Sequence, residues 1–172
     1  MKPDDVMFSA TVRAEQARRG SRKGYAQAAA KGHFRRELPD EVVAFIAERN
    51  SAYLATAGAD GQPYVQHRGG PPGFLRVLDR STVAFADYGG NRQYISTGNL
   101  AENERAFLFL MDYAEARRLK LWGRARVVAD DSGLLARVAD PGYGARIEQA
   151  IVFSVLAWDW NCSQHIPRLV PA

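Results

Sequence analysis

The sequence predicts a mainly β protein of the α+β class, in which an antiparallel barrel or sandwich is flanked by a few helices. Six or seven short apolar or alternating segments follow one another from residue 51 onward, as in strands joined by tight turns. Glycine- and proline-containing stretches separate these segments. Helical patterns are short and are concentrated in the first 50 residues.

The chain has the length of a single domain. A protein of 172 residues can bury about 70% of the surface of its unfolded form, so it needs no disulfide or metal to fold. One cysteine cannot form an internal disulfide, and no stretch approaches the roughly 20 apolar residues of a membrane span. We therefore expect a soluble, cytoplasmic protein. The net charge of +4 fits an anionic ligand and also weak attraction to nucleic acid, so it selects neither.

Residues 1–36 are predicted to form an N-terminal helical extension, and residues 37–172 the main domain. The extension is rich in arginine and lysine and poor in large apolar residues. Good helix formers occupy Ala14–Arg19 and Ala26–Lys31, and glycines interrupt them. We expect two short helices that lie on the main domain or on a partner subunit. The alternative is a partly disordered basic arm.

The main domain is predicted to begin with a helix from Pro39 to Arg49. A proline suits the first helical turn, acidic residues follow it, and Val42, Phe45 and Ile46 form an apolar stripe. The pattern then changes to strands. The predicted strands are Ala52–Thr56, Pro63–Arg68, Phe74–Leu78, Thr82–Asp87, Ala106–Met111, Arg118–Val128 and Ile151–Trp158, and the later helices are Asn91–Asn103 and Ser132–Val138.

Two loops place an arginine beside consecutive glycines at the end of a strand. The segment Gln66–Gly73 contains Arg68, and the segment Asp87–Gln93 contains Arg92 and leads into a helix whose predicted N-cap is Asn91. Glycine lets backbone amides approach a ligand. Arginine offers a fork of donors for phosphate oxygens, and a helix N-terminus adds free N–H groups. These features predict an anion site, although such turns are also common in ordinary hairpins.

A set of short motifs lies between Phe45 and Val128. They are Tyr53–Thr56, Asp60–Tyr64, His67–Phe74, Phe85–Asp87, Gly90–Arg92, Asn99–Asn103 and Arg118–Gly123. Together these motifs resemble the pyridoxamine-phosphate oxidase family of FMN-binding split barrels. The end of the chain, Ala157–Cys162 and Gln164–Ile166, resembles an uncharacterised flavin-binding branch of that family.

The resemblance implies a six- to seven-stranded antiparallel split barrel, an FMN cofactor and a homodimer with FMN at the subunit interface. It implies contacts to the flavin ring and ribityl chain from the strand before Gly69, and to the phosphate from the segment around Arg92. Arg118 is implied at or across the interface, and a C-terminal tryptophan over the flavin ring. The implied cofactor-binding residues are Gln66, His67, Arg68, Asp87, Asn91, Arg92, Gln93, Ser96, Asn99, Arg118, Trp158 and Trp160.

The chain departs from the true oxidase in its substrate site. The oxidase has a Ser-Arg-Lys run where this chain has Asn91-Arg92-Gln93, and a substrate-binding lysine where this chain has Gly69-Gly70. A counterpart of its C-terminal substrate arginine is not evident. The sequence therefore indicates FMN binding without indicating oxidation of pyridoxamine phosphate.

The sequence is compatible with several functions. The first is an FMN-dependent oxidoreductase that acts on an unknown small substrate, with no catalytic residue identified. The second is a flavin carrier or sensor without catalytic activity. A third keeps the barrel but binds haem or a deazaflavin. Nucleic-acid binding through the basic extension is disfavoured, because aromatic residues are not interleaved with that segment.

Two further positions allow more than one interpretation. His67 either donates a proton near the flavin or is a structural histidine. Cys162 and His165 have the spacing of half a zinc site, but a closed site needs four ligands, so we expect no metal. A nucleophilic Cys162 would need a depressed pKa and a base. We expect a packing or flavin-contact role for this pair instead.

Overall fold

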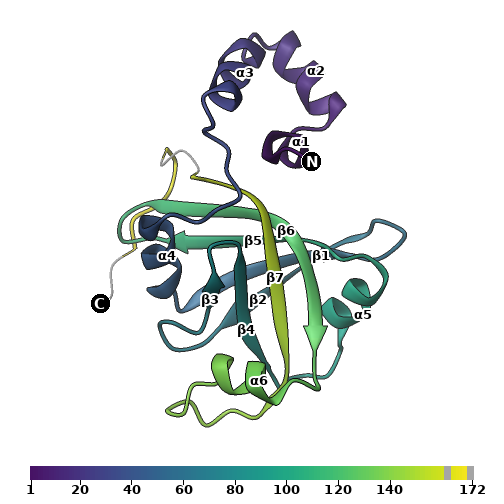
Figure 1. Ribbon diagram of the computed structural model, residues 1–172, viewed down its shortest axis with the longest axis vertical. Helices are drawn as coiled ribbons and strands as arrows, with labels where there is room; N and C mark the ends of the chain where they lie inside the picture. Colours follow the sequence, from purple (N-terminus) through teal and green to yellow (C-terminus); the bar gives the residue numbers. More distant parts are fainter. Residues whose placement is uncertain (161–163, 170–172) are drawn as a thin grey trace.

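The computed structural model describes residues 1–160 and 164–169, which form a seven-stranded antiparallel sheet curled into a barrel, with six helices around it (Figure 1). The strand order is β2-β1-β5-β6-β7-β4-β3. This confirms the predicted mainly β architecture with flanking helices. The strands are β1 (Ser51–Ala57), β2 (Pro63–Gly69), β3 (Arg76–Asp79), β4 (Thr82–Tyr88), β5 (Arg105–Asp112), β6 (Arg117–Val128) and β7 (Ile147–Trp160). The helices are α1 (Pro3–Met7), α2 (Ala10–Arg18), α3 (Arg22–Ala30), α4 (Asp40–Ala47), α5 (Ile95–Glu102) and α6 (Ser132–Val138).

The barrel interior is filled by the apolar residues that alternate along the strands. Leu54, Leu108 and Leu121 come from three neighbouring strands and are fully buried. The aromatic rings of Phe85 and Phe153 fill the same core from β4 and β7. Helix α4 packs its apolar stripe into this core, and helix α6 covers a smaller cluster on the outside of β4 and β7. The period-2 pattern therefore sets which face of each strand is buried.

Residues 1–36, all of which are described, contain three helices where two were predicted. The additional helix α1 begins at Pro3, and Asp4 and Asp5 favour its first turn. Phe8, after α1, contacts the rings of Tyr25 and Phe34 at centroid distances of 5.3 Å. Helices α2 and α3 stand away from the barrel in Figure 1, while α1 contacts β7. The three helices cover most of this segment.

Helix α5 begins at Ile95, so the prediction that it begins at Asn91 was wrong. Arg92 and Tyr94 have φ angles of 59° and 52°, in the left-handed region that a right-handed helix cannot contain. The Asn91 side chain is not an N-cap. It accepts a hydrogen bond of 3.2 Å from the backbone N–H of Gln93 and so stabilises a turn before the helix.

Two strand boundaries also differ from the prediction. Strand β7 begins at Ile147, four residues early, because it continues to pair with β4 as far as Tyr88. Strand β3 begins at Arg76, two residues late, because the N–H of Phe74 bonds to the carbonyl of Pro71 and closes a turn. No helix in the described part of the chain is long and apolar enough to cross a membrane.

The pairing of β6 with β7 leaves no room for a side chain at Gly123. The register of the two strands shifts between Trp122 and Gly123. A Cβ atom on Gly123 would lie 2.3 Å from the carbonyl oxygen of Ser154 and 2.5 Å from the Phe153 ring. Both neighbours belong to β7. One is a backbone atom and the other a fully buried ring, so neither can move away without disturbing the core.

We therefore expect Gly123→Ala to lower the free energy of unfolding by about 2–3 kcal/mol, as overpacked core substitutions do. Urea denaturation measures this as a lower midpoint at an unchanged slope. Gly98→Ala in α5 is the matched control, since a Cβ there meets nothing within 4 Å. Equal stability of the two variants would contradict the close approach.

Candidate functional site

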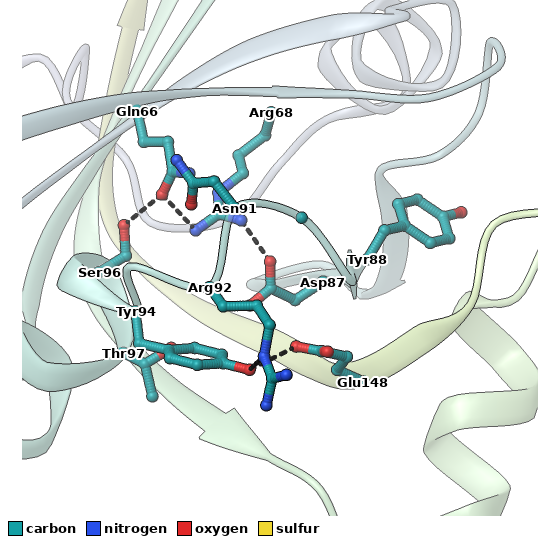
Figure 2. Close-up of a pocket in the computed structure, with 11 residues that line it drawn as sticks. Gln66, Arg68, Asp87, Tyr88, Asn91, Arg92, Tyr94, Ser96, Thr97 and Glu148 are labelled. Carbon is teal, nitrogen blue, oxygen red and sulfur yellow. Dashed lines mark hydrogen bonds and ion pairs between the residues drawn. The ribbon is translucent and has the colours of Figure 1, made fainter.

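A polar cavity of about 250 Å³ lies where the ends of β2 and β4 meet the start of α5 (Figure 2). The loop between β4 and α5 forms one wall, and the first residues of β7 form another. The lining residues are Gln66, Arg68, Asp87, Tyr88, Gly90, Asn91, Arg92, Tyr94, Ser96, Thr97 and Glu148.

The floor of the cavity is an ion pair between Arg68 of β2 and Asp87 of β4. The side chains are 13% and 11% exposed, so water screens the pair only weakly. Gln149 of β7 donates a hydrogen bond of 2.8 Å to the second oxygen of Asp87. The same amide group donates to the Thr97 hydroxyl at 3.0 Å, which ties α5 to β7.

Gln66 connects this floor to helix α5. Its side-chain oxygen accepts hydrogen bonds of 2.9 Å from Arg68 and 2.9 Å from the Ser96 hydroxyl. Ser96 is 2% exposed and lies in the first turn of α5. The first N–H groups of a helix have no partner within the helix, so this wall of the cavity presents donors suited to an anion.

Arg92 is the exposed arginine of the cavity. Its Nε donates a hydrogen bond of 3.3 Å to the Tyr94 hydroxyl, which in turn donates one of 3.3 Å to Glu148. Figure 2 shows the Arg92 side chain directed along the Glu148 wall, away from Gln66 and Arg68. The hydrogen bond to Tyr94, with the negative charge of Glu148, raises the pKa of Arg92 above its usual value.

The cavity brings together half of the residues that the resemblance implicated. These are Gln66, Arg68, Asp87, Asn91, Arg92 and Ser96.

Three other implicated residues lie near the cavity without lining it. Asn99 donates a hydrogen bond of 3.0 Å to the buried hydroxyl of Thr56, so it attaches α5 to β1. Gln93 is exposed in the turn before α5. His67 is on the opposite face of β2 from its neighbours, next to the Tyr53 ring at 5.7 Å and the Ser51 hydroxyl at 3.3 Å.

The remaining three implicated residues lie toward the other end of the barrel. Trp158 is nine residues along β7 from Gln149, a distance of about 30 Å in an extended strand. Its indole donates to the carbonyl of Glu37 at 2.8 Å. Trp160 packs edge-on against Phe45 at 4.9 Å. Arg118 is at the start of β6, level with the end of β5. Within one chain, none of the three reaches the cavity.

Sequence reasoning missed Tyr88, Tyr94, Thr97, Glu148 and Gln149. The last two precede the predicted start of β7, and only the pairing with β4 places them beside Asp87. Tyr88 contacts the Tyr143 ring at 5.1 Å. Burial, together with the nearby charge of Asp140, raises the pKa of its hydroxyl.

The second interpretation left open by the sequence concerned the C-terminal pair. Cys162 lies outside the described residues. His165 is exposed and has a φ of 62°. Among residues 1–160 and 164–169, no three potential ligands of the His, Cys, Asp and Glu types cluster as a metal site would require.

The comparisons with known proteins agree with this barrel. Residues 38–159 match the family described as pyridoxamine 5'-phosphate oxidase. The chain belongs to this family. No sequence among the curated proteins matches the chain.

Solved structures show the same fold as this member of the oxidase family. HupZ of Group A Streptococcus has a TM-score of 0.59 at 15% identity, over 77% of this chain and 100% of its own. An FMN-binding protein of Syntrophomonas wolfei has a TM-score of 0.55 at 11% identity, over 84% and 96%. Rv2991 of Mycobacterium tuberculosis has a TM-score of 0.52 at 17% identity, over 80% and 94%. These identities are low, so the likeness concerns the fold alone.

The ion pair at the floor of the cavity can be tested by its contribution to stability. We expect Asp87→Leu to lower the free energy of unfolding by about 3–5 kcal/mol, because Arg68 would keep a buried charge without its partner. The double variant with Arg68→Met should recover most of this loss, since two apolar side chains replace the pair. Chemical denaturation of both variants is the measurement, and a double variant as unstable as the single one would contradict the pairing.

Proposed function

We propose that the protein binds FMN and that it is an FMN-dependent oxidoreductase acting on a small organic substrate. The observation that supports the proposal is a polar cavity with hydrogen-bond donors suited to an anion, on a barrel of the oxidase family. There, Arg92, the Ser96 hydroxyl and the N-terminus of α5 line one cavity. A phosphate has several acceptor oxygens, and a guanidinium group together with helix N–H groups satisfies them.

The cavity is too small to hold a whole FMN molecule, so a second surface would have to bind the rest of the cofactor. Sites for whole small ligands usually measure about 300–1,000 Å³, and this cavity measures about 250 Å³. It therefore suits the phosphate and part of the ribityl chain. The flavin ring would extend beyond it and would need a second surface.

We infer that a second copy of the chain supplies this surface. The outer face of β1, β5 and β6 carries Tyr53, Phe107, Phe109 and Trp122 in half-buried positions. Phe107 contacts Trp122 at 5.0 Å and Phe109 at 6.5 Å, so these rings form one patch, and Val65 of β2 is 58% exposed. Contiguous apolar patches mark interaction surfaces. A homodimer through this patch would also bring Arg118, Trp158 or Trp160 closer to the cofactor of the other chain.

The division of labour in such a flavoprotein is simple. The bound flavin would supply the electron-transfer chemistry. The residues of this chain would hold the phosphate, orient the ring and exclude water. No acid or base is assigned among them.

The known substrate of the named oxidase is disfavoured by the packing at Gly70. A Cβ atom there would lie 2.7 Å from that of Phe74, which is 2% exposed. The oxidase has a substrate-binding lysine in this region of the motif, and this chain has no room for a side chain at Gly70. A flavin carrier is therefore the second candidate. Reduction of the bound flavin by NADPH, followed by reoxidation with candidate acceptors, separates the two functions.

We expect Arg92→Ala to weaken FMN binding by about 10–100-fold, as the loss of a charge-assisted hydrogen bond does. Riboflavin, which lacks the phosphate, should bind equally to both proteins. Calorimetric or fluorescence titration measures the two dissociation constants. Arg137→Ala, on an exposed face of α6, is the control. An unchanged FMN affinity for Arg92→Ala would refute the phosphate assignment.

The proposed dimer makes a separate prediction. Phe107→Glu places a charge in the centre of the aromatic patch, so we expect a monomer in sedimentation velocity and weaker FMN binding. Tyr113→Glu, in the exposed β5–β6 loop, is the control and should keep the wild-type mass. A Phe107→Glu protein with that same mass would exclude this face as the interface.

A further inference from the structure

Charge is balanced around the cavity. Among the described residues that line it, Arg68 and Arg92 stand against Asp87 and Glu148. Arg68 and Asp87 neutralise each other directly at the floor. The other two are linked through a hydroxyl group, since Arg92 donates to Tyr94 and Tyr94 donates to Glu148, each at 3.3 Å. The cavity therefore contains carboxylates where a phosphate is expected.

The loop that carries Arg92 holds this arrangement in an uncommon backbone conformation. Arg92 and Tyr94 both have left-handed φ angles, of 59° and 52°, which disfavour residues with a Cβ atom. Tyr94 is 45% exposed, so burial does little to hold it. Its hydroxyl contact with Glu148 attaches the loop to β7. The position of the Arg92 side chain thus depends on a carboxylate of a different element.

We propose that Glu148 competes with the ligand phosphate for the guanidinium group of Arg92. It holds Arg92, through Tyr94, against the β7 wall, and a phosphate must take over this guanidinium group in order to bind. The same carboxylate repels an arriving dianion. Glu148 therefore sets how strongly the cavity prefers a phosphomonoester to an uncharged ligand of the same shape. This inference rests on the proposed FMN site.

The direct test is Glu148→Gln, which keeps an acceptor for the Tyr94 hydroxyl but removes the charge. We expect FMN to bind about three- to tenfold more tightly, a modest gain because water screens groups this exposed. Riboflavin affinity should change less than twofold. Glu104→Gln removes the same charge just before β5, where Glu104 pairs with Arg124 outside the cavity, and should leave both affinities unchanged.

A second variant pair tests whether Glu148 acts through Arg92. In the Arg92→Ala background, Glu148→Gln should give less than half of its gain in FMN affinity, because the guanidinium group for which it competes is gone. A full gain in that background would overturn the inference. So would weaker FMN binding by Glu148→Gln in the wild-type background, or an equal gain for FMN and riboflavin.

Titration with inorganic phosphate separates this inference from the proposed function. If FMN binds to none of the proteins, the proposed function fails. Tighter phosphate binding by Glu148→Gln than by the wild-type protein would then still support the competition. Equal phosphate binding by the two proteins would overturn it.

Discussion

The ion pair between Arg68 and Asp87 is the contact on which the cavity depends. Strand β2 is at one edge of the sheet and β4 is second from the other edge, so no backbone ladder joins them. The ion pair bridges them instead, at low exposure. A buried charge pair is stable only when its remaining donors and acceptors are satisfied. Gln66 bonds to the second terminal nitrogen of Arg68 and Gln149 to the second oxygen of Asp87, while the buried Nε of Arg68 has no hydrogen-bond partner among the described residues. Through Ser96 and Thr97, the two glutamines also fix the start of α5.

The two arginines of the cavity differ in their surroundings. Arg68 is mostly buried and is paired with Asp87, whereas Arg92 is exposed and is bonded only to the Tyr94 hydroxyl among the described residues. In the proposed phosphate site, Arg68 would therefore stabilise the cavity and Arg92 would bind the ligand. Preorganised donors bind a ligand without a large ordering cost. In the proposed site, the Arg68–Asp87 pair would keep its place, and the ligand phosphate and Glu148 would compete for Arg92.

Much of the fold could be predicted because the core strands alternate in hydrophobicity. In β6, for example, every second residue from Leu119 to Ala125 is buried, and the series includes Gly123, where a side chain would collide with β7. The start of α5 could not be predicted. It depends on Arg92 and Tyr94, which have left-handed φ angles. The conformational preferences of the residues in this segment do not distinguish a turn from the first turn of a helix. The early start of β7 follows from pairing with β4, which is a tertiary effect.

The candidate site was predictable only in part, and for a physical reason. Glycine beside arginine identified both segments that supply the arginines of the cavity, although the glycines at 69–73 do not line it. Glu148 was not visible, because it lies in a segment with no apolar alternation and reaches the site through sheet register. His67 neighbours the cavity residues in sequence but lies on the other face of β2, as the alternation of a strand requires. Arg118 and Trp158 lie far from the cavity within one chain, so only the proposed homodimer would bring them to a cofactor.

The most direct test of this account is a map of backbone amide chemical shifts during titration, first with FMN and then with riboflavin. Both ligands should perturb amides around Gln66 and Arg68. Only FMN should perturb Gly89–Thr97, where the phosphate is expected to lie. Equal perturbation of that segment by the two ligands, or FMN-specific shifts confined to another part of the barrel, would contradict it.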